Sequence, residues 1–281
     1  MLSVVVDDHD MNVNMIIRGD DHLNNAFRQA HIYKQLGWTI PKYGHLPLIH
    51  GADGSKLSKR HGSIDINEFK IQGYLPQAII NNLILLGWSP KKENEIIEFE
   101  EIVNLFDIKK ISKSSSIFDY QKLDFFNNYY LQKENNYKDF EKYVQNNNFI
   151  KKYFYKDQEK IKNIFNAYKG KIKKLFEFIE IITIYFDNNL ETKNDSILDS
   201  NFKNLLNKFL AKLTNINDWN EDNLELCINN FINNENIKFS KFGKPFRHLL
   251  TNNKDGISIS LVMFILGKDL TFKRINNYIK K

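Results

Sequence analysis

The chain has 281 residues, of which 42% are hydrophobic and 26% are charged, and its net charge is +6. This length and balance predict a globular protein of one large domain or two to three small ones. The single cysteine, Cys227, excludes a disulfide framework and a cysteine-based zinc site within the chain. A chain with a single cysteine fits a reducing, cytoplasmic compartment. No apolar run is long enough to span a membrane, so we expect no membrane partner.

Positive charge is concentrated in the middle of the chain. The segment Phe106–Lys174 holds 16 Lys and 8 Asp or Glu, a net charge of +8. Such a stripe is typical of a surface that follows a phosphate backbone. It is equally compatible with a compositional bias, because Lys, Asn and Ile are abundant throughout the sequence. The charge alone leaves both explanations open.

The first 50 residues predict half of a parallel sheet. Short apolar runs indicate buried strands, and apolar residues at helical spacing indicate one helix between them. We expect Asp20 or Asp21 to cap this helix and Gly37 to end it. In chain order, the expected elements are a strand at Leu2–Val6, a strand at Val13–Ile17, a helix at Leu23–Leu36 and a strand at Tyr43–Ile49.

The loop that follows is the most informative segment of the sequence. Lys56–Arg60 places two lysines, a serine and an arginine among Gly51, Gly54 and Gly62. Ammonium and guanidinium groups bind phosphate, and glycine lets the backbone approach a ligand closely. The loop follows a predicted strand, and α/β sheets bind ligands at the carboxyl ends of their strands. Taken alone, the loop is also consistent with a solvated basic turn.

After Asp65 the pattern is helical almost throughout. Pro76 is suited to the first turn of a helix, and Gly87 to its end. Linkers are expected near residues 187–199 and 252–256. The expected helices are Leu75–Gly87, Phe99–Phe106, Leu123–Tyr130, Phe140–Asn147, Gln158–Tyr168, Ile172–Phe186, Asn201–Leu213, Glu221–Ile232, Pro245–Thr251, Ser258–Leu266 and Leu270–Ile279.

Ten short segments form a pattern that is specific as an ordered set. They are Val5–Met11, Ile17–Leu23, Gly44–Leu48, Lys56–Gly62, Gly73–Pro76, Leu86–Trp88, Ile111–Ser114, Phe118–Leu123, Phe246–Thr251 and Leu266–Lys268. Together they resemble segments of bacterial glutamyl-tRNA synthetases, which are class I aminoacyl-tRNA synthetases. The matches are dense before Leu131 and sparse between Glu134 and Lys244.

The resemblance implies a fold that is α/β at its start and mainly α afterwards. Residues 1–65 would form the second half of a Rossmann-type class I catalytic domain that carries the lysine loop. Residues 66–130 would form a helical stem-contact region, and residues 131–281 an all-helical anticodon-binding domain. This assignment gives the basic stripe an independent link to nucleic acid.

The resemblance also implies roles for residues of the lysine loop and the strand before it. Lys56–Arg60 matches the second signature of the family. Lys59 would contact the ATP phosphates and stabilise the transition state of adenylation, while Lys56 and Ser58 would hold the closed form of the loop. Leu48 and Ile49 would offer backbone groups to adenine.

Two further residues would face the amino acid. Arg18 matches the arginine that receives the substrate carboxylate, a role that suits a bidentate guanidinium. A salt bridge from Arg18 to Asp20 or Asp21 is the alternative. His22 would contact substrate, with a packing or capping role equally open.

Contacts with tRNA are expected from the helical part. Lys109, Lys110 and Lys113 are candidate phosphate contacts, which are independent of base sequence. Arg247 lies in a matching segment, where reading a base and packing its helix are equally open. Most phenylalanines are expected in the core, so no stacking residue is singled out.

No metal site is expected in the chain. The histidines at 45, 50 and 61 have a spacing that suits no compact set of ligands, and no cysteine or acidic cluster completes one. Zinc is therefore not expected. The ion to expect is Mg²⁺, which would arrive with ATP.

One part of the family pattern is absent, because the first signature, His-x-Gly-His, occurs nowhere in the sequence. We expect the chain to be the later part of a synthetase whose first part lies upstream, and to be unable to charge tRNA by itself. The chain begins at the edge of a predicted central strand, and half a doubly wound sheet would leave a hydrophobic edge uncovered.

The function expected from the resemblance is that of a glutamate–tRNA ligase. It would use ATP, L-glutamate and tRNA(Glu), pass through a glutamyl-adenylate, and act as a monomer at full length. A non-catalytic tRNA-binding module or remnant is the alternative. A glutaminyl enzyme is disfavoured because that family usually ends in β-barrels. Charging of glutamate tRNA alone, or of glutamine tRNA as well, is compatible with the sequence.

Overall fold

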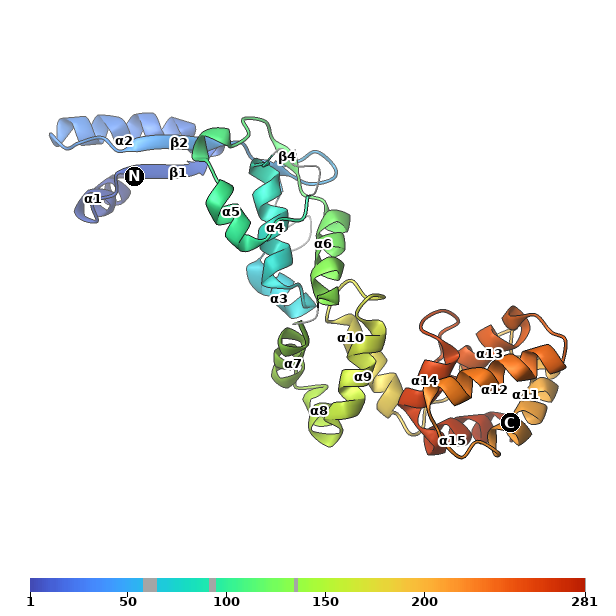
Figure 1. Ribbon diagram of the computed structural model, residues 1–281. Coiled ribbons are helices and arrows are strands. Elements are labelled where there is room, and N and C mark those ends of the chain that lie inside the picture. The colour runs from blue at the N-terminus through green and yellow to red at the C-terminus, as the bar shows by residue number, and fades with distance from the viewer. Residues whose placement is uncertain (58–64, 91–94, 134–135, 281) are drawn as a thin grey trace. The chain divides into compact units, whose positions relative to one another are not determined.

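The computed structural model describes residues 1–57, 65–90, 95–133 and 136–280. Two compact units make up the chain, Met1–Tyr130 and Leu131–Lys281 (Figure 1). The first holds all the strands of the described residues, and the second is helical. The further division of the first unit at residue 65 stays a prediction.

The first unit begins with a helix followed by alternating strands and helices. Strand β1 pairs in parallel with β2, and β3 pairs in parallel with β4. A parallel pair needs a crossover connection, which the helix between β1 and β2 supplies. The elements are α1 (Leu2–Asp10), β1 (Met15–Gly19), η1 (Asp20–His22), α2 (Leu23–Gln35), β2 (Lys42–Leu46), β3 (Ile49–His50) and β4 (Ser116–Ile117).

The predicted strand at Leu2–Val6 is wrong, because these residues begin helix α1. A short apolar run does not distinguish a buried strand from a buried helix. Helical spacing turns Val5 inward, where it is fully buried, and stacks the ring of His9 on Trp38 at a centroid distance of 3.7 Å. These contacts hold α1 beside α2.

Two other local predictions need correction. Asp20 and Asp21 do not cap α2; they form the 3-10 turn η1, and the helix begins after His22 without a side-chain cap. The predicted strand at Tyr43–Ile49 is interrupted at Pro47, which has no N–H for a ladder and lies between β2 and β3. Gly37 does end α2, in the left-handed region at φ +70°.

The rest of the first unit is helical and is joined by buried amides. Its elements are α3 (Ile66–Gln72), α4 (Pro76–Gly87), α5 (Phe99–Leu105), η3 (Ile108–Lys110) and α6 (Tyr120–Gln132). Asn127 of α6 accepts from the backbone N–H of Leu75 at 2.7 Å, just before α4 begins. Asn81 of α4 accepts from the N–H of Ile97 at 2.8 Å and from the Tyr130 hydroxyl at 3.1 Å. These bonds satisfy buried polar groups and fix α4 against α6.

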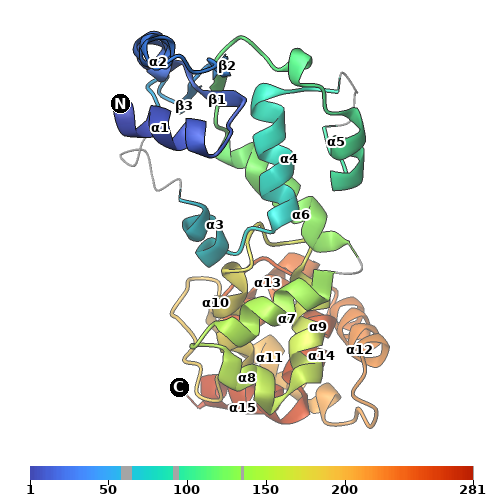
Figure 2. The ribbon, with the colours of Figure 1, turned by 90° about the vertical axis from the view of Figure 1, so that its left-hand side faces the viewer.

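The second unit is held by two clusters of aromatic side chains. Phe140, Phe165 and Phe178 pack with ring centroids 4.7–5.5 Å apart. A further cluster surrounds Phe209 and Phe242. The helices of this unit, labelled in Figure 2, are α7 (Tyr137–Asn146), α8 (Lys151–Lys156), α9 (Gln158–Tyr168), α10 (Glu177–Phe186), α11 (Ser200–Leu213), α12 (Glu221–Asn234), α13 (Phe239–Thr251), α14 (Ile259–Leu266) and α15 (Lys268–Ile279).

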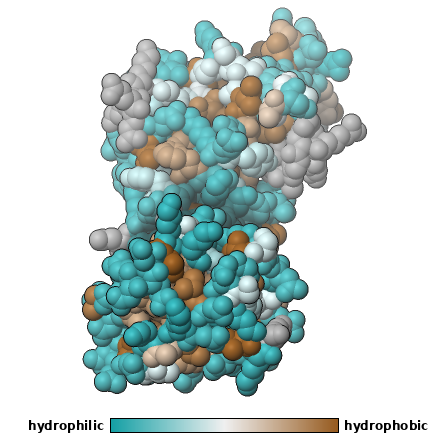
Figure 3. Space-filling view, turned by 90° about the vertical axis from the view of Figure 1, so that its right-hand side faces the viewer, coloured by the Kyte–Doolittle hydropathy of each residue, from teal (hydrophilic) through white to brown (hydrophobic). Residues whose placement is uncertain are grey.

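The surface seen in Figure 3 mixes hydrophilic residues with scattered hydrophobic ones. Singly scattered apolar side chains are normal on the surface of a folded protein and are informative only where they gather into a patch. No helix of the described residues combines the length and the apolar character that crossing a membrane requires.

A buried arginine joins the helices of the second unit at their ends. The guanidinium of Arg274 on α15 donates to the carbonyl oxygens of Leu250, Ile184 and Asp187, the last at 2.8 Å. These carbonyls lie at the C-terminal ends of α13 and α10, where helices leave acceptors unpaired. The Arg274 side chain is only 3% exposed, and burial lowers its pKa to about 10, so it stays charged at neutral pH.

Replacement of this arginine tests its structural role. Arg274→Met keeps the volume but leaves three carbonyls without their donor, so we expect a loss of roughly 3–5 kcal/mol in the free energy of unfolding. Urea denaturation followed by circular dichroism measures it. The exposed neighbour Lys273→Met serves as the matched control, and equal stabilities of the two variants would contradict the role.

Candidate active site

The candidate site is built on the paired strands β1 and β2. Their register sets Ile16 opposite Tyr43 and Arg18 opposite His45. Residues that pair directly across strands share a face of the sheet, and so do residues two apart. Arg18, Tyr43 and His45 therefore lie on one face near the carboxyl ends of both strands.

Arg18 is positioned by two neighbours on this face. Its Nη2 donates to Oε1 of Gln29 at 2.9 Å, and its guanidinium lies 5.4 Å from the centroid of the Tyr43 ring. Gln29 comes from α2 and is only 4% exposed. The alternative predicted for Arg18, an ion pair with Asp20 or Asp21, does not form among the described residues.

The face around Arg18 also has spare hydrogen-bonding capacity. Arg18 Nε, Tyr43 Oη, His45 Nε2 and Tyr33 Oη are buried and have no hydrogen-bond partner among the described residues. Burial raises the pKa of Tyr43 and the pKa of Tyr33, so both hydroxyls remain neutral donors. Because buried polar groups are normally paired, this set suits a polar, anionic ligand.

An ion pair ties the lysine loop to the end of β1. Lys56 Nζ lies 2.6 Å from Asp21 Oδ2, and this hydrogen bond holds the pKa of Asp21 below its ordinary value. The backbone of Lys56 also bridges to His50, and the N–H of Leu57 donates to the carbonyl of Ile49 at 2.9 Å. The loop therefore starts from a fixed position beside η1.

Two predicted catalytic residues, Ser58 and Lys59, lie outside the described residues, as does the His61 of the rejected metal set. Their roles stay predictions. Among the residues that are described, no group of three or more His, Cys, Asp or Glu side chains could hold a metal ion.

The two residues predicted to meet adenine lie between β2 and the lysine loop. Ile49 begins β3, where it is paired with Ser116 of β4. The side chain of Leu48 lies close to Gly19: a Cβ atom added to that glycine would be 3.5 Å from Leu48 Cδ2. The same added Cβ would lie 2.6 Å from Asp21 Oδ1, so a larger residue at this strand end would require the Asp21 carboxylate to shift.

His22 lies at the start of α2, with most of its side chain exposed. Its Nδ1 is 3.3 Å from the Asn25 amide, and its Nε2 is 4.0 Å from Asp21. Asp21 links the His22 ring to the lysine loop, because its other carboxylate oxygen pairs with Lys56. The His22 side chain does not cap α2. Contact with substrate stays a prediction.

The structure brings two of the predicted tRNA lysines to the same region. A pocket of about 310 Å³ is lined by Asp20 and His45 on one side and by Lys109 and Lys113 on the other. Lys110 points elsewhere, toward Asp107, at 4.0 Å. A basic rim therefore borders the strand ends.

Arg247 uses its guanidinium within its own unit. Its Nε donates to the carbonyl of Ile257 at 3.1 Å, and its Nη1 to that of Lys254 at 2.7 Å. Both acceptors belong to the connection between α13 and α14. Of the two roles predicted for Arg247, these bonds support packing.

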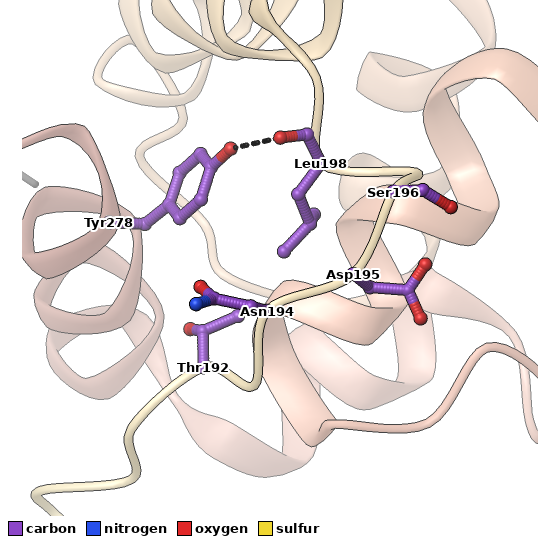
Figure 4. Close-up of a pocket in the computed structure, with 6 residues that line it drawn as sticks. All are labelled: Thr192, Asn194, Asp195, Ser196, Leu198 and Tyr278. Carbon is purple, nitrogen blue, oxygen red and sulfur yellow. Dashed lines mark hydrogen bonds between the residues drawn. The ribbon is translucent and has the colours of Figure 1, made fainter.

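A second pocket, in the helical unit, has a lining that includes none of the predicted site residues. Its volume is about 380 Å³, and it lies between the linker after α10 and the end of α15 (Figure 4). Tyr278 donates to the carbonyl of Leu198 at 3.1 Å across it. Asp195, also in the lining, pairs with Lys254 at 2.7 Å. The linker is thus fixed to the helices.

Sequence reasoning missed Gln29, Tyr43 and Asp21. Gln29 and Tyr43 position Arg18, and Asp21 positions Lys56. The only available signal was the Asp20–Asp21 pair that follows Arg18, which we interpreted as a helix cap or as an ion-pair partner of Arg18. The contacts of Gln29 and Asp21 span 11 and 35 residues of sequence, respectively.

Comparisons with known proteins agree with this arrangement. The family model for the catalytic domain of class I tRNA synthetases (E and Q) matches residues 1–125, and the model for an anticodon binding domain matches residues 136–279. A glutamate–tRNA ligase of Afipia carboxidovorans is 35% identical over 99% of this chain, and one of Bradyrhizobium sp. is 36% identical over the same share.

Solved structures give the same result for the fold. A glutamate tRNA ligase from Elizabethkingia meningosepticum, solved in complex with its amino acid, has a TM-score of 0.80 at 25% sequence identity. The match covers 99% of this chain and 59% of that one. The chain spans about 60% of the length of the curated relatives. Over nearly all of its own length, therefore, the chain belongs to the glutamate–tRNA ligase family of class I tRNA synthetases.

Proposed function

We propose that the protein supplies part of a glutamate–tRNA ligase, which joins glutamate to tRNA(Glu) with cleavage of ATP to AMP and pyrophosphate. One observation carries the proposal: an arginine and a lysine, each held by a hydrogen bond to a neighbouring side chain, lie at the same strand ends. Gln29 holds Arg18, and Asp21 holds Lys56 at the start of the lysine loop. The Arg18 site suits a carboxylate, and the loop suits phosphates.

The chemistry needs both anion sites. In the first step a glutamate carboxylate oxygen attacks the α-phosphorus of ATP, forming glutamyl-adenylate and releasing pyrophosphate. In the second step a ribose hydroxyl of the tRNA attacks the acyl carbon and AMP leaves. Lys59 would stabilise the charge that builds up on the phosphates, and Arg18 would orient glutamate. Mg²⁺ bound with ATP would neutralise part of the phosphate charge.

The adenine and tRNA contacts belong to the same proposal. The backbone of Leu48 and Ile49 would receive adenine beside β3, and His22 would lie at the edge of the glutamate site. Lys109 and Lys113 would contact tRNA phosphates at the rim of the first unit, with Lys110 beside them. The helical unit would bind the anticodon arm. A cytoplasmic, monomeric ligase is the form we propose.

A non-catalytic tRNA-binding module is the second candidate. The observation that favours it is the lack of a His-x-Gly-His sequence in a chain that spans about 60% of its relatives. The positioned side chains of Arg18 and Lys56 favour the ligase, because a protein that only binds tRNA does not require these two residues to be held at the strand ends. We predict that the 281-residue chain alone does not charge tRNA; charging by the pure chain would contradict this.

The ligase proposal is tested in a hybrid in which this chain replaces the matching part of the Afipia carboxidovorans relative. We expect the hybrid to charge tRNA(Glu) with radiolabelled glutamate. Arg18→Ala should lower kcat/KM for glutamate by roughly 100-fold, because a charged carboxylate loses its partner. Lys59→Ala should lower the rate of adenylation by roughly 100- to 1,000-fold.

Arg28→Ala, an exposed arginine on the same helix as Gln29, is the matched control for Arg18 and should charge normally. A hybrid that binds tRNA but charges none would favour the binding module. A hybrid whose activity is unchanged by Arg18→Ala would remove the proposed glutamate site.

The ion pair that holds the loop makes a separate prediction. Asp21→Asn removes the carboxylate charge, so amide hydrogen exchange in residues 54–57 should speed up at pH 7. Because the folded-state pKa of Asp21 is lowered from 3.8, the wild-type ion pair persists at neutral pH and is lost only as pH falls below that value. Mass spectrometry measures the exchange.

Asp20→Asn is the control for this experiment, because Asp20 is the neighbouring carboxylate and does not hold Lys56. Equal exchange in both variants would show that the backbone bonds of the loop, and not the ion pair, fix its start.

A further inference from the structure

The beginning of the first unit has more apolar side chains exposed than buried. Only three hydrophobic residues of the first 40 are buried, namely Val5, Ala26 and Tyr33. Ten large apolar side chains of the same segment are exposed, out of 29 in the described part of the chain, and they range from Val4 at 43% to Met11 at 76%. Single exposed apolar residues are normal, but a gathering of this kind marks an interaction surface.

One face of the β1–β2 sheet is open in the part of the chain that the structure describes. Helix α2 lies on the face of Arg18, to which it brings Gln29. Successive residues of a strand point to opposite faces, so Met15 and Ile17 of β1 lie on the other face, where each is 45% exposed. Ile17 also lines the pocket of about 310 Å³, which borders this face at its carboxyl end. Parallel sheets are normally covered on both faces, so this one lacks a layer.

The sheet is also open at its edges. Among the residues that are described, β1 and β2 form a ladder only with each other. Each strand therefore keeps one row of backbone N–H and C=O groups that no ladder satisfies, which is a template for another strand. When a strand is added, main-chain hydrogen bonds supply affinity and alternate side chains supply specificity. We call the face of Met15 and Ile17, together with the two free edges, the open sheet surface.

Three occupants of the open sheet surface differ in what they would supply. A tRNA is an anion and does not cover apolar side chains such as Met15 and Ile17. A second copy of this chain would add the same elements again and would still lack a His-x-Gly-His sequence. The matched part is 60% of the curated relatives, which leaves about 40% of their length without a counterpart here. A polypeptide that corresponds to the unmatched part would cover the surface and also complete the family pattern.

We propose that the open sheet surface is a subunit interface, which binds a separate polypeptide corresponding to the unmatched part of the relatives. The partner would add a strand to a free edge and an apolar layer over Met15 and Ile17. A peptide bond between the two chains is not required, because strand pairing and apolar burial are both non-covalent. One copy of each chain corresponds to one full-length monomer. This inference rests on the proposed function and names the partner that completes the same site.

The test uses two separate chains, the 281-residue protein and the part of the Afipia carboxidovorans relative that has no counterpart in it. Size-exclusion chromatography with light scattering should show a complex of one copy of each. Amide hydrogen exchange at residues 15–19 and 42–46 should slow on mixing, because a paired and covered strand opens less often. Charging of tRNA(Glu) should require both chains.

Two changes on the open face test where the partner binds. Met15→Asp with Ile17→Asp places charges against an apolar layer, so Kd for the partner should rise by at least about ten-fold. Ile17→Thr keeps the branched shape that suits a strand and should raise Kd by roughly three-fold. Leu226→Asp is the matched control, because Leu226 is 60% exposed on α12 in the other unit, and it should bind as the wild type does. Circular dichroism checks that each variant is folded.

Two results would overturn the proposal. In the first, the separate chains do not associate although the fused hybrid charges tRNA(Glu), so the ligase stands and the subunit interface fails. In the second, the double aspartate variant binds the partner as tightly as the Leu226→Asp control does. If the separate chains associate through this surface but neither they nor the fused hybrid charge tRNA, the interface stands and the proposed ligase fails.

Discussion

The parallel register of β1 and β2 places Arg18 beside His45. From the end of β2 the chain continues into the lysine loop. A two-stranded parallel sheet is weak by itself, and its crossover helix has to stabilise it. Helix α2 does more than connect the strands, because it brings Gln29 to the guanidinium of Arg18. Each later feature of the candidate site depends on this arrangement: the turn η1, the Asp21 carboxylate and the fixed start of the loop.

The helical unit is organised by different forces. Aromatic clusters supply the apolar core, and Arg274 supplies donors to the ends of two helices. The first unit holds its helices through buried amides such as Asn81 and Asn127. In the proposed ligase, the strand ends bind the small substrates and the helical unit binds tRNA.

Much of the fold was predictable because its signals are local. Helix α9 has the bounds that its apolar spacing predicts, and α4 runs from Pro76 to Gly87 as its first and last residues indicate. The strand expected at the beginning was wrong because four apolar residues fit a buried helix equally well. Sequence composition could not decide between them; only the packing of Val5 and His9 does.

The candidate site was predictable in part. Motif resemblance identified Arg18 and Lys56, since those residue types carry the anion chemistry. Their partners, Gln29 and Asp21, were not predictable because their contacts depend on which elements the fold brings together. Arg274 was hidden for a related reason: an arginine in a polar helix is usually exposed, and its burial follows from two distant helix ends.

The central claim is that this chain contains the tRNA-binding part of a glutamate–tRNA ligase together with part of its catalytic site. Nuclease footprinting of tRNA(Glu) on the 281-residue chain, with an unrelated tRNA in parallel, tests it most directly. The account predicts protection of the anticodon loop and of one stem in tRNA(Glu), and weaker protection in the other tRNA. Absence of protection, or equal protection of both tRNAs, would contradict it.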